Sequence, residues 1–504
     1  MPSKIMTSAL TGLIAEPVEV ECDISAGLSS FTIVGLPDTA VQESRERIRA
    51  AVKNSGLDFP RTRVTVNLAP ADVRKEGPAY DLPIAVAILE RAGAITNGVP
   101  DSSLFIGELA LDGSVRPVNG ALSIALDAGR RKIKTLFVPS GNSTEAALAP
   151  EVSVFPVRNL TDLVEHLEGR RPIVSAPRTI PSSSDPKDAT DLSAIRGQEQ
   201  AKRALTIAAA GGHNLLFTGP PGSGKTLLAR ALPGILPPLT LPEALEVTQI
   251  WSVAGALPSD TALLWERPFR SPHHTASGVA LVGGGTNPKP GEVSLAHRGV
   301  LFLDELPEFS RAVLENLRQP IEDGFVTISR AAGTLRFPAK FMMVGSLNPC
   351  PCGYASDPGS QCSCTPNQIT KYQKKISGPL LDRIDLVAEV PRVKFDHLTA
   401  ETSVEPSSAV RDRVAAARER QLQRFQDRGI ISNAEMALKD LKAFCQLDEA
   451  GLNLVRSAVQ RHRLSARAYH RLLKVSRTIA DLEGSDRIEQ RHIAEALTYR
   501  AKVE

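Results

Sequence analysis

The segment of this 504-residue chain that most restricts its fold is "NLLFTGPPGSGKTLLARAL", which contains the motif G-x-x-x-x-G-K-[ST]. The apolar run 214–218 predicts a buried strand, the glycine-rich run 219–224 a loop, and the residues from Lys225 onward a helix. Glycines in such a loop let backbone N–H groups turn toward phosphate oxygens, and the helix N-terminus adds the positive end of its dipole. The sequence therefore predicts a phosphate cradle, for which a glycine-rich turn without a ligand is the alternative.

The cradle comes with a defined set of candidate ligands. Lys225 is expected to hold the β- and γ-phosphates of a nucleotide, and Thr226 is expected to bind Mg²⁺. The cofactors that this motif predicts are therefore ATP and Mg²⁺. The residues expected to contact them are Gly219, Pro220, Pro221, Gly222, Ser223, Gly224, Lys225 and Thr226.

A second acidic element is needed to fix the magnesium and to activate water, and "GVLFLDEL" supplies it. The apolar run 299–303 predicts a strand that ends in Asp304 and Glu305. Asp304 is expected to bind Mg²⁺ through its water shell, and Glu305 to polarise the attacking water. A strand that ends in Asp-Glu is by itself often just a strand end. Its position about 80 residues after a phosphate loop favours a hydrolysis centre.

Three further polar residues follow in an order that suits nucleotide hydrolysis. Asn348 comes after the apolar run "KFMMVGSLN" and is expected to orient the water or to touch the γ-phosphate. Arg383 in "GPLLDRIDL" and Arg467 in "LSARAYHRLL" are candidates to supply positive charge to the transferred group. Each has an ordinary alternative, because asparagine often caps turns and a helical arginine usually faces solvent.

The length of the chain predicts more than one domain, since single cores rarely grow beyond about 250–300 residues. The stretch 169–191, "GRRPIVSAPRTIPSSSDPKDATD", is rich in proline, serine and charge and has the composition of a linker. We expect an α/β domain over 1–170, a linker over 171–190, an α/β ATPase core over 191–392 and an α-helical lid over 393–504. A net charge of +3 means that nucleic-acid binding would need local basic features.

Four of the six cysteines form the spacing C-x-C-x9-C-x-C directly after Asn348. Four thiolates close together would neutralise and saturate a tetrahedral Zn²⁺, which gives a closed structural site. Reduced structural thiols and a redox pair are the alternatives, since C-x-C is tighter than the usual C-x2-C. The predicted zinc ligands are Cys350, Cys352, Cys362 and Cys364. Cys22 and Cys445 lie far away and are expected to be small buried residues.

The order of phosphate loop, Asp-Glu strand, asparagine, LLDR and S-x-R resembles the AAA+ ATPases, in the helix-2-insert branch that contains the magnesium chelatase motor subunits and the MCM helicases. The closer resemblance is to the Mg-chelatase-like ComM/YifB family. It rests on "RPFRSPHHTAS", "GGGTNPKPGEVSLAHRGVLFLDELPEF", "LRQPIEDG", "NPCPCG" and "LSARAYHRLLKVSRTIADL". The resemblance extends over nearly the whole chain.

This resemblance implies a fold and a set of roles. The implied fold is α/β, with an N-terminal ribosomal-S5-domain-2-like (Lon protease-like) domain, an AAA+ P-loop core of the helix-2-insert branch and a C-terminal α-helical lid. Asn348 would take the first sensor role, Arg467 the second, and Arg383 the role of arginine finger. Because an arginine finger reaches a neighbour's nucleotide, the resemblance implies a ring, normally a homo-hexamer.

The first 170 residues look like the proteolytic domain of Lon, which uses a Ser-Lys dyad. Where Lon carries its serine in Lys-Asp-Gly-Pro-Ser, this chain has the run 75–79, which ends in Ala79. Where Lon has its lysine, the run 117–121 is followed by Leu122. Neither a hydroxyl nor an amine remains at these two positions. The domain is therefore expected to be protease-inactive, and to serve as a ring-forming or partner-binding scaffold.

Two segments are candidates to grip a polymer. "GFVTISRAAGTLRFP" predicts a β-hairpin with Arg330 at its turn, and the inserted segment "SGVALVGGGTNPKPGEVSLAHRG" carries Lys289 in a Gly/Pro loop. Such residues suit phosphate contacts that carry no sequence information, although single surface charges are common. ComM proteins are hexameric helicases that promote branch migration of transforming DNA. The resemblance thus implies single-stranded or branched DNA as partner, with recombination proteins as further partners.

Two other functions stay open on the sequence alone. A magnesium-chelatase-type motor subunit would remodel a metal-inserting partner, and a protein-remodelling AAA+ ATPase would not respond to DNA. No apolar run reaches the roughly 18 residues that a membrane span needs, and the first residues make a poor signal peptide. We therefore expect a cytoplasmic ATPase without membrane contact.

Overall fold

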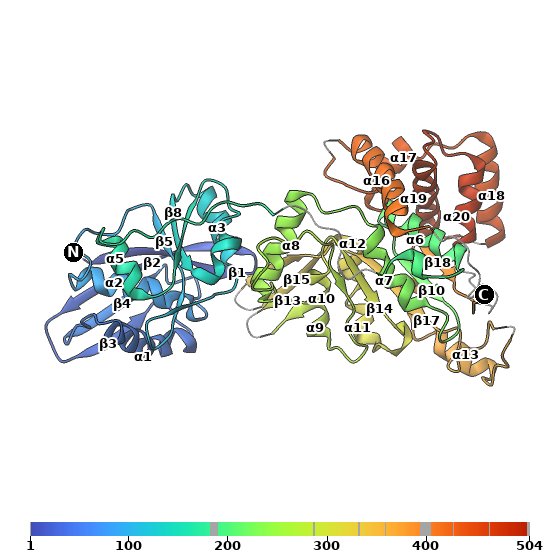
Figure 1. Cartoon of the computed structure of the whole chain (residues 1–504). Helices are drawn as coiled ribbons and strands as arrows, with labels where there is room; N and C mark the ends of the chain where they lie inside the picture. The colour runs from blue at the N-terminus through green and yellow to red at the C-terminus, as the bar shows by residue number, and fades with distance from the viewer. Residues whose placement is uncertain are drawn as a thin grey trace. The chain divides into compact units, whose positions relative to one another are not determined.

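The structure is a computed structural model that describes residues 2–181, 190–285, 288–330, 333–357, 359–393, 405–426, 428–462 and 464–500 (Figure 1). Across these residues the chain divides into two compact units. The first unit contains the chain up to residue 181 together with 244–264, and the second contains the remainder. A piece of the sequence that follows the phosphate loop therefore folds with the first unit.

The first unit is built on a mixed sheet, whose strands are β1 (Ser3–Thr11), β2 (Ile14–Ser25), β3 (Ser30–Val34), β4 (Arg63–Ala69), β5 (Ser103–Phe105), β8 (Thr135–Pro139) and β9 (Ser153–Val157). Among the residues described, their order is β3-β4-β2-β1-β5-β8-β9. The pair β1 and β2 is antiparallel, whereas β5, β8 and β9 run parallel to β1. A separate short pair consists of β6 (Glu108–Leu109) and β7 (Val115–Arg116).

The helices of the first unit are α1 (Thr39–Asn54), α2 (Asp81–Arg91), α3 (Ala121–Arg130), α4 (Ser143–Ala146) and α5 (Leu160–Leu167). These helices and the mixed sheet confirm the α/β character predicted for this segment. Every residue of α2 from Asp81 to Leu89 is buried, as a helix that is apolar on all sides requires. Helix α8 (Leu241–Ala254) contributes most of its length to this unit.

The second unit contains a parallel sheet formed by β10 (Leu215–Thr218), β11 (Phe269–Arg270), β14 (Val300–Leu303), β17 (Met342–Leu347) and β18 (Leu386–Glu389). Its order in the described chain is β11-β14-β17-β10-β18, and every pairing is parallel. The strands predicted at 214–218 and 299–303 are confirmed. Their side chains are mostly buried, because helices cover both faces of such a sheet.

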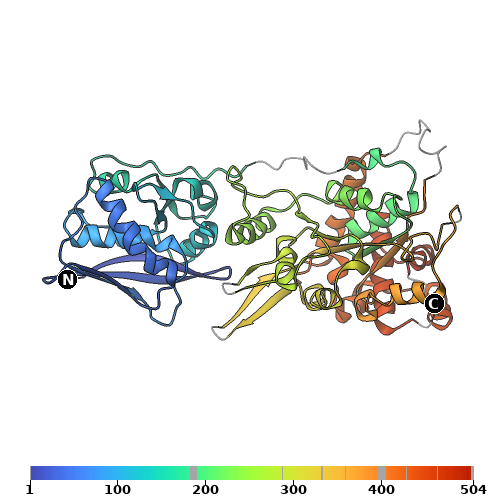
Figure 2. The same ribbon diagram turned by 90° about the horizontal axis from the view of Figure 1, so that it is seen from below.

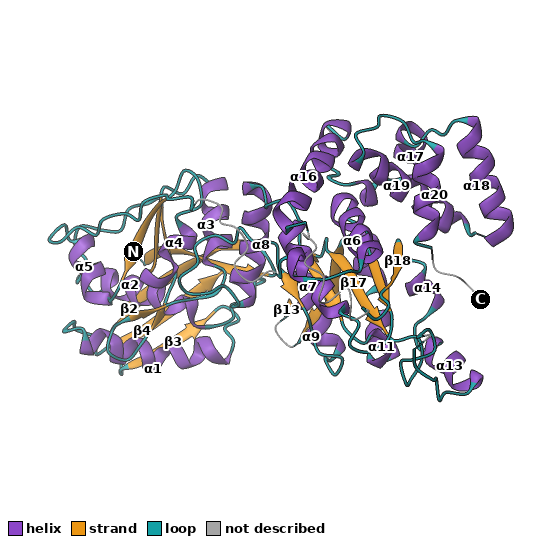
Figure 3. Cartoon of the chain, turned by 45° about the vertical axis from the view of Figure 1, so that its right-hand side comes forward, coloured by secondary structure: helices purple, strands orange, loops and turns teal. Residues whose placement is uncertain are grey.

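The helices of the ATPase segment are α6 (Glu199–Gly211), α7 (Lys225–Ile235), α9 (Gly278–Val282), α10 (Glu292–Leu295), α11 (Arg311–Glu315), α12 (Arg318–Asp323), α13 (Pro366–Gln373) and α14 (Gly378–Leu381). The C-terminal helices are α16 (Ser407–Arg424), α17 (Leu438–Phe444), α18 (Glu449–His462), α19 (Ala466–Leu482) and α20 (Gln490–Thr498). Figure 3 shows these C-terminal helices gathered together. Gly429, between α16 and α17, and Gly484, between α19 and α20, have positive φ angles.

The second unit also contains two β-hairpins, which are separate from its five-stranded sheet. One pairs β12 (Gly283–Gly284) with β13 (Lys289–Pro290), and the other pairs β15 (Phe325–Arg330) with β16 (Gly333–Pro338). Figure 2 shows the second as two long yellow arrows, and the predicted hairpin is thereby confirmed. The two hairpins adjoin each other, since a Cβ on Gly283 would lie 3.3 Å from Cδ1 of Ile328.

One apolar core joins the second unit's sheet to its C-terminal helices. It includes Leu215 and Val344 from the sheet and Leu472 and Ile479 from α19, all nearly or fully buried. Burying each such side chain contributes about 1.5–3 kcal/mol, so helices and sheet hold each other in place. Among the described helices, none combines the length and apolar character that a membrane crossing requires.

Candidate nucleotide-hydrolysis site

The phosphate loop lies at the carboxyl end of β10 and leads into α7. Gly222 and Gly224 have φ angles of 72° and 95°, and a Cβ on either would meet open space within 4 Å. Gly219 has no such room, because a Cβ there would overlap the carbonyl oxygen of Val390 after β18. The glycines therefore serve two purposes, close packing on the sheet and a left-handed backbone that L side chains rarely adopt.

Lys225 is buried at the first position of α7. Its ammonium donates hydrogen bonds of 2.8 Å to the carbonyls of Gly219 and Pro220, and one of 3.2 Å to Oδ1 of Asn348. Burial lowers the pKa of Lys225, while the charges of Asp304 and Glu305 act against that change. The three hydrogen-bond partners of the ammonium are neutral oxygens, so its charge stays available for phosphate oxygens.

Thr226 and Asp304 meet at the edge of the sheet, where the Thr226 hydroxyl donates a 2.9 Å hydrogen bond to Oδ2 of Asp304. Neighbouring oxygen ligands of an octahedral Mg²⁺ are separated by about 2.9 Å. The oxygens of this pair therefore fit the Mg²⁺ that accompanies a bound nucleotide. The motif residues and the Asp-Glu strand, far apart in sequence, are thus brought together.

Glu305 has a strained backbone, with a φ angle of 50°. A left-handed conformation costs a residue other than glycine roughly 1–2 kcal/mol. Ser346 stabilises it, because the Glu305 N–H donates a 3.2 Å hydrogen bond to the Ser346 hydroxyl, which in turn donates to Oδ1 of Asp304. Strain of this kind concentrates at functional sites, which is where the sequence places Glu305.

Sequence reasoning missed Ser346. A signal for Ser346 was available in the sequence. Ser346 lies in β17, two residues before Asn348, and side chains two residues apart along a strand share a face. The hydroxyl is buried at 1% exposure, and it holds both acidic residues in place.

Asn348 is braced by the segment that follows it. Gln373 of α13 donates a 3.4 Å hydrogen bond to the carbonyl of Pro349. Burial raises the pKa of Tyr372 to about 12, and a hydrogen bond from the Asn348 backbone acts against that rise. The four-cysteine loop also reaches the phosphate loop, because Gly353 packs so closely on Pro221 that a Cβ would overlap it.

The four cysteines of this loop converge, with all four sulfurs within 4.8 Å of one another. The sulfurs of Cys350, Cys352 and Cys362 are separated by 3.3, 3.6 and 3.7 Å, and Cys364 accepts a 3.4 Å hydrogen bond from the N–H of Cys352. Sulfurs bound to a tetrahedral Zn²⁺ are about 3.8 Å apart. The cluster fits such an ion. Cys22 and Cys445 are buried elsewhere, as predicted.

Arg383 and Arg467 are not brought to the phosphate loop. Arg383 precedes β18, and its carbonyl accepts a 3.0 Å hydrogen bond from Asn214, the residue before β10. The strands are parallel, so Arg383 lies at the amino edge of the sheet, about 13 Å of strand away from the carboxyl edge. Arg467 joins it there, because both guanidinium groups pair with Glu322 at 2.5 and 3.2 Å.

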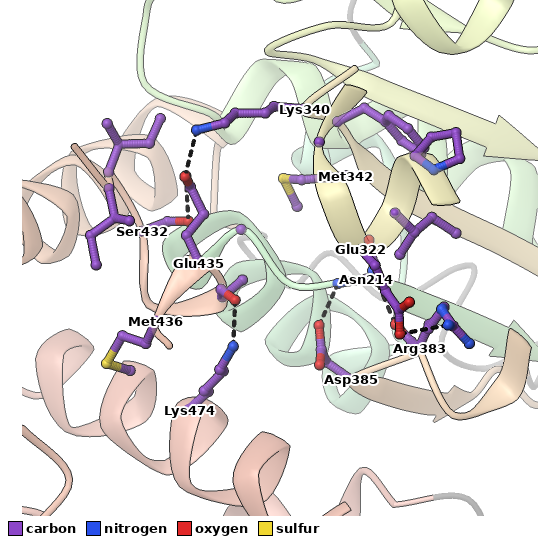
Figure 4. A pocket seen from close by; sticks show the side chains of 18 of the residues that line it. Asn214, Glu322, Lys340, Met342, Arg383, Asp385, Ser432, Glu435, Met436 and Lys474 are labelled. Atoms are coloured by element: carbon purple, nitrogen blue, oxygen red, sulfur yellow. Dashed lines mark hydrogen bonds and ion pairs between the residues drawn. The ribbon is translucent and has the colours of Figure 1, made fainter. Parts of the chain in front are cut away.

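A cavity of about 590 Å³ lies at this amino edge (Figure 4). Among the described residues that line it are eight lysines and arginines against five aspartates and glutamates. Figure 4 shows Arg383 beside Glu322, and Asn214 beside Asp385. The phosphate loop and Asp304 do not contribute to its lining. The second unit therefore has two separate polar sites at opposite edges of one sheet.

The two residues predicted to contact DNA lie on the two adjoining hairpins. Lys289 begins β13 and is exposed, and Arg330 ends β15. The side chain of Arg330 lies outside the described residues. Arg336 on β16 is exposed, with its guanidinium 3.7 Å from the centre of the Phe325 ring.

In the first unit, the two positions at which Lon carries its dyad are occupied by apolar residues, as predicted. Leu122 is fully buried in α3, and the carbonyl of Ala79 accepts a 2.9 Å hydrogen bond from the N–H of Gly107. Lys75 is also fully buried and donates to the carbonyl of Pro70, and burial lowers its pKa. These residues pack the domain, and no hydroxyl stands at either dyad position.

The strand order, the phosphate loop and the Asp-Glu strand define a P-loop ATPase of the AAA+ class. The family models for "Magnesium chelatase, subunit ChlI", for "Subunit ChlI of Mg-chelatase" and for its C-terminal region match residues 191–398, 20–142 and 404–500. Full-length relatives agree, and the chain belongs to the Mg-chelatase-like family that contains ComM and YifB. Membership in this family implies ATPase activity.

Three curated relatives illustrate the similarity. The chain is 45% identical to the competence protein ComM of Haemophilus influenzae, over 99% of this chain and 97% of that protein. It is 44% identical to the uncharacterized protein YifB of Salmonella typhimurium, over 99% and 96%. A Lon protease of Brevibacillus choshinensis is 24% identical over 34% of this chain and 24% of its own length.

Proposed function

We propose that the protein is an ATP-hydrolysing DNA motor that assembles as a hexameric ring and acts as a helicase in branch migration during DNA uptake and recombination. The observation that carries this proposal is the division of the polar residues between two edges of one sheet. Lys225 and Asp304 lie at the carboxyl edge, whereas Arg383 lies at the amino edge. An arginine at that edge reaches a nucleotide only if another subunit holds it.

Within this proposal, each residue has a chemical task. Lys225 and the loop N–H groups bind the phosphates, and Asn348 orients the water that Glu305 polarises. Thr226 and Asp304 would hold the Mg²⁺, which neutralises charge on the phosphate oxygens. Arg383 and Arg467 of a neighbouring subunit stabilise the charge that develops on the transferred group.

The hairpins supply the proposed DNA contacts. Lys289 and Arg336 are exposed on adjoining hairpins, and Arg330 ends the strand that leads to the tip of the longer one. Contacts from such side chains to phosphates are independent of base sequence, which suits a motor that moves along a strand. The similarity to a protein named for competence supports a role in DNA uptake.

The test is the ATPase rate of the purified protein at low salt, with and without single-stranded or branched DNA. We expect both DNA forms to bind and to raise the rate, since a motor couples turnover to its track. A rate that ignores DNA, together with no binding at low salt, would contradict the proposal while leaving the ATPase assignment intact.

A protein-remodelling motor is the second candidate, either of the magnesium chelatase type or of another substrate. The specific observation in its favour is that the matching family models are named for a magnesium chelatase subunit. It predicts ATP hydrolysis that responds to a protein partner and not to DNA. The same assay therefore separates the two candidates.

We also propose that Cys350, Cys352, Cys362 and Cys364 hold a structural Zn²⁺. Four sulfur ligands leave no open position, so the ion would brace the loop rather than take part in hydrolysis. A cytoplasmic location agrees with this role, because thiols there stay reduced and free to bind a metal.

A further inference from the structure

Glu322 lies where three separate elements of the second unit meet. It is near the end of α12, Arg383 precedes β18, and Arg467 is in the first turn of α19. Its Oε1 atom pairs with Nη2 of Arg383 at 2.5 Å and with Nη2 of Arg467 at 3.2 Å. One carboxylate oxygen therefore joins two guanidinium groups that lie 84 residues apart in sequence.

The environments of the two arginines explain why they need this carboxylate. The side chain of Arg383 is 7% exposed and that of Arg467 is 61% exposed. Arg383 also donates a 2.5 Å hydrogen bond to the carbonyl of Pro379, and its buried Nε has no partner among the described atoms. Two positive charges held this close repel each other unless an anion lies between them.

The backbone that carries Arg383 is held independently of Glu322. Arg471, one turn further along α19, donates to the carbonyl of Ile384 at 2.5 Å and pairs with Asp382 at 3.6 Å. Loss of the Glu322 carboxylate would therefore leave the loop in place and release only the guanidinium groups. This separation makes the role of Glu322 testable.

We propose that Glu322 is a positioning residue, which aligns Arg383 and Arg467 as a pair for a nucleotide bound to the neighbouring subunit. This inference rests on the proposed function, because it needs the ring that brings the amino edge of one subunit to the phosphate loop of another. Glu322 lines the amino-edge cavity, away from the phosphate loop of its own subunit. It acts by fixing the distance between two cations, which would otherwise separate.

The first experiment compares Glu322→Gln, Glu322→Asp and Asp323→Asn in steady-state ATPase assays on the full chain. Asp323 is the matched control, because it lines the same cavity and has no ion pair among the described residues. We expect Glu322→Gln to lower kcat about tenfold with KM changed less than about twofold, since the arginines act on the transition state. Glu322→Asp should recover part of the loss, and Asp323→Asn should match the wild type. Equal kcat in Glu322→Gln and Asp323→Asn would overturn the inference.

The second experiment tests whether Glu322 acts across subunits. Subunits with Glu322→Gln are co-expressed with subunits carrying Lys225→Ala under two affinity tags, and mixed assemblies are purified through both tags. The Lys225→Ala subunit keeps its arginine pair aligned but lacks the phosphate ligand, whereas the Glu322→Gln subunit binds ATP. We expect mixed assemblies to exceed the average of the two separate variants. A rate at or below that average would overturn the inference.

Failure of the proposed function gives a different result. If Arg383→Ala hydrolyses ATP at the wild-type rate, the arginine has no role in turnover and the shared proposal falls. If Arg383→Ala is inactive and Glu322→Gln is normal, only the inference about Glu322 falls.

Discussion

The two edges of the second unit's sheet differ in which parts of a nucleotide-hydrolysis site they hold. At the carboxyl edge, Lys225 donates a hydrogen bond to Asn348, and Thr226 donates one to Asp304. At the amino edge, Arg383 and Arg467 are held by Glu322 and have no phosphate loop beside them. The first edge carries the groups that bind a nucleotide, whereas in the proposed ring the second would supply charge to a nucleotide on the neighbouring subunit. Binding and turnover are therefore expected to respond differently to substitution.

The largest effect is expected from removing the arginine of the amino edge. In the proposed ring, Arg383→Ala should lower kcat on the order of 10³-fold, which is the effect of losing an arginine finger, while ATP binding stays close to that of the wild type. Nucleotide affinity by fluorescence titration and turnover by phosphate release measure the two properties. Co-assembly with Lys225→Ala subunits should restore part of the activity, and the absence of any recovery would contradict a site shared between subunits.

At the carboxyl edge, Glu305→Gln should lower kcat roughly 100-fold while ATP binding is retained, because the amide cannot polarise water as a carboxylate does. The measurement is single-turnover hydrolysis with enzyme in excess. The matched control is Glu308→Gln, an exposed carboxylate three residues away that pairs with Lys375. If both variants behave alike, Glu305 has no special part in hydrolysis.

Ser346→Ala tests the residue that the sequence did not reveal. Loss of the hydroxyl removes the partner of the strained Glu305 backbone and of Asp304, so kcat should fall about tenfold. The Mg²⁺ concentration for half-maximal activity should rise as well. A variant with unchanged Mg²⁺ dependence would show that Ser346 only packs the strand.

Removal of the proposed Zn²⁺ from the four-cysteine loop should have a smaller effect. Cys362→Ser or chelation is expected to lower ATP hydrolysis severalfold, because the loop packs on Pro221 of the phosphate loop and begins two residues after Asn348. Zinc content by atomic emission is measured beside the ATPase rate, with Cys445→Ser as the control. Protein that is kept reduced and contains almost no zinc would contradict the site.

The smallest effect is expected in the first unit. Ala79→Ser should leave ATP hydrolysis unchanged and create no peptidase activity, since Leu122 still occupies the position of the general base. A fluorescent casein assay beside the ATPase assay measures both. Peptidase activity in the wild-type chain that is lost on substitution in this unit would contradict the scaffold role.

Most of the carboxyl edge was predictable because each part is a local pattern. A buried strand followed by glycines and Lys225, and another followed by Asp304, are encoded within about ten residues each. Ser346 was not predicted, because a serine within an apolar strand resembles many others. Glu322 was not predicted either, since its importance depends on two arginines that are distant in sequence.

The sequence by itself determined the phosphate loop, the acidic strand, the cysteine spacing and the family of this protein. The tertiary structure alone decided which edge of the sheet each polar residue occupies. The physical reason is that a motif specifies its own strand and loop, whereas the edge depends on the direction of every strand in the sheet. Strands β10, β17 and β18 pair in parallel, and α19 packs against this sheet. Arg383 and Arg467 therefore lie at the amino edge, and Lys225 lies at the carboxyl edge.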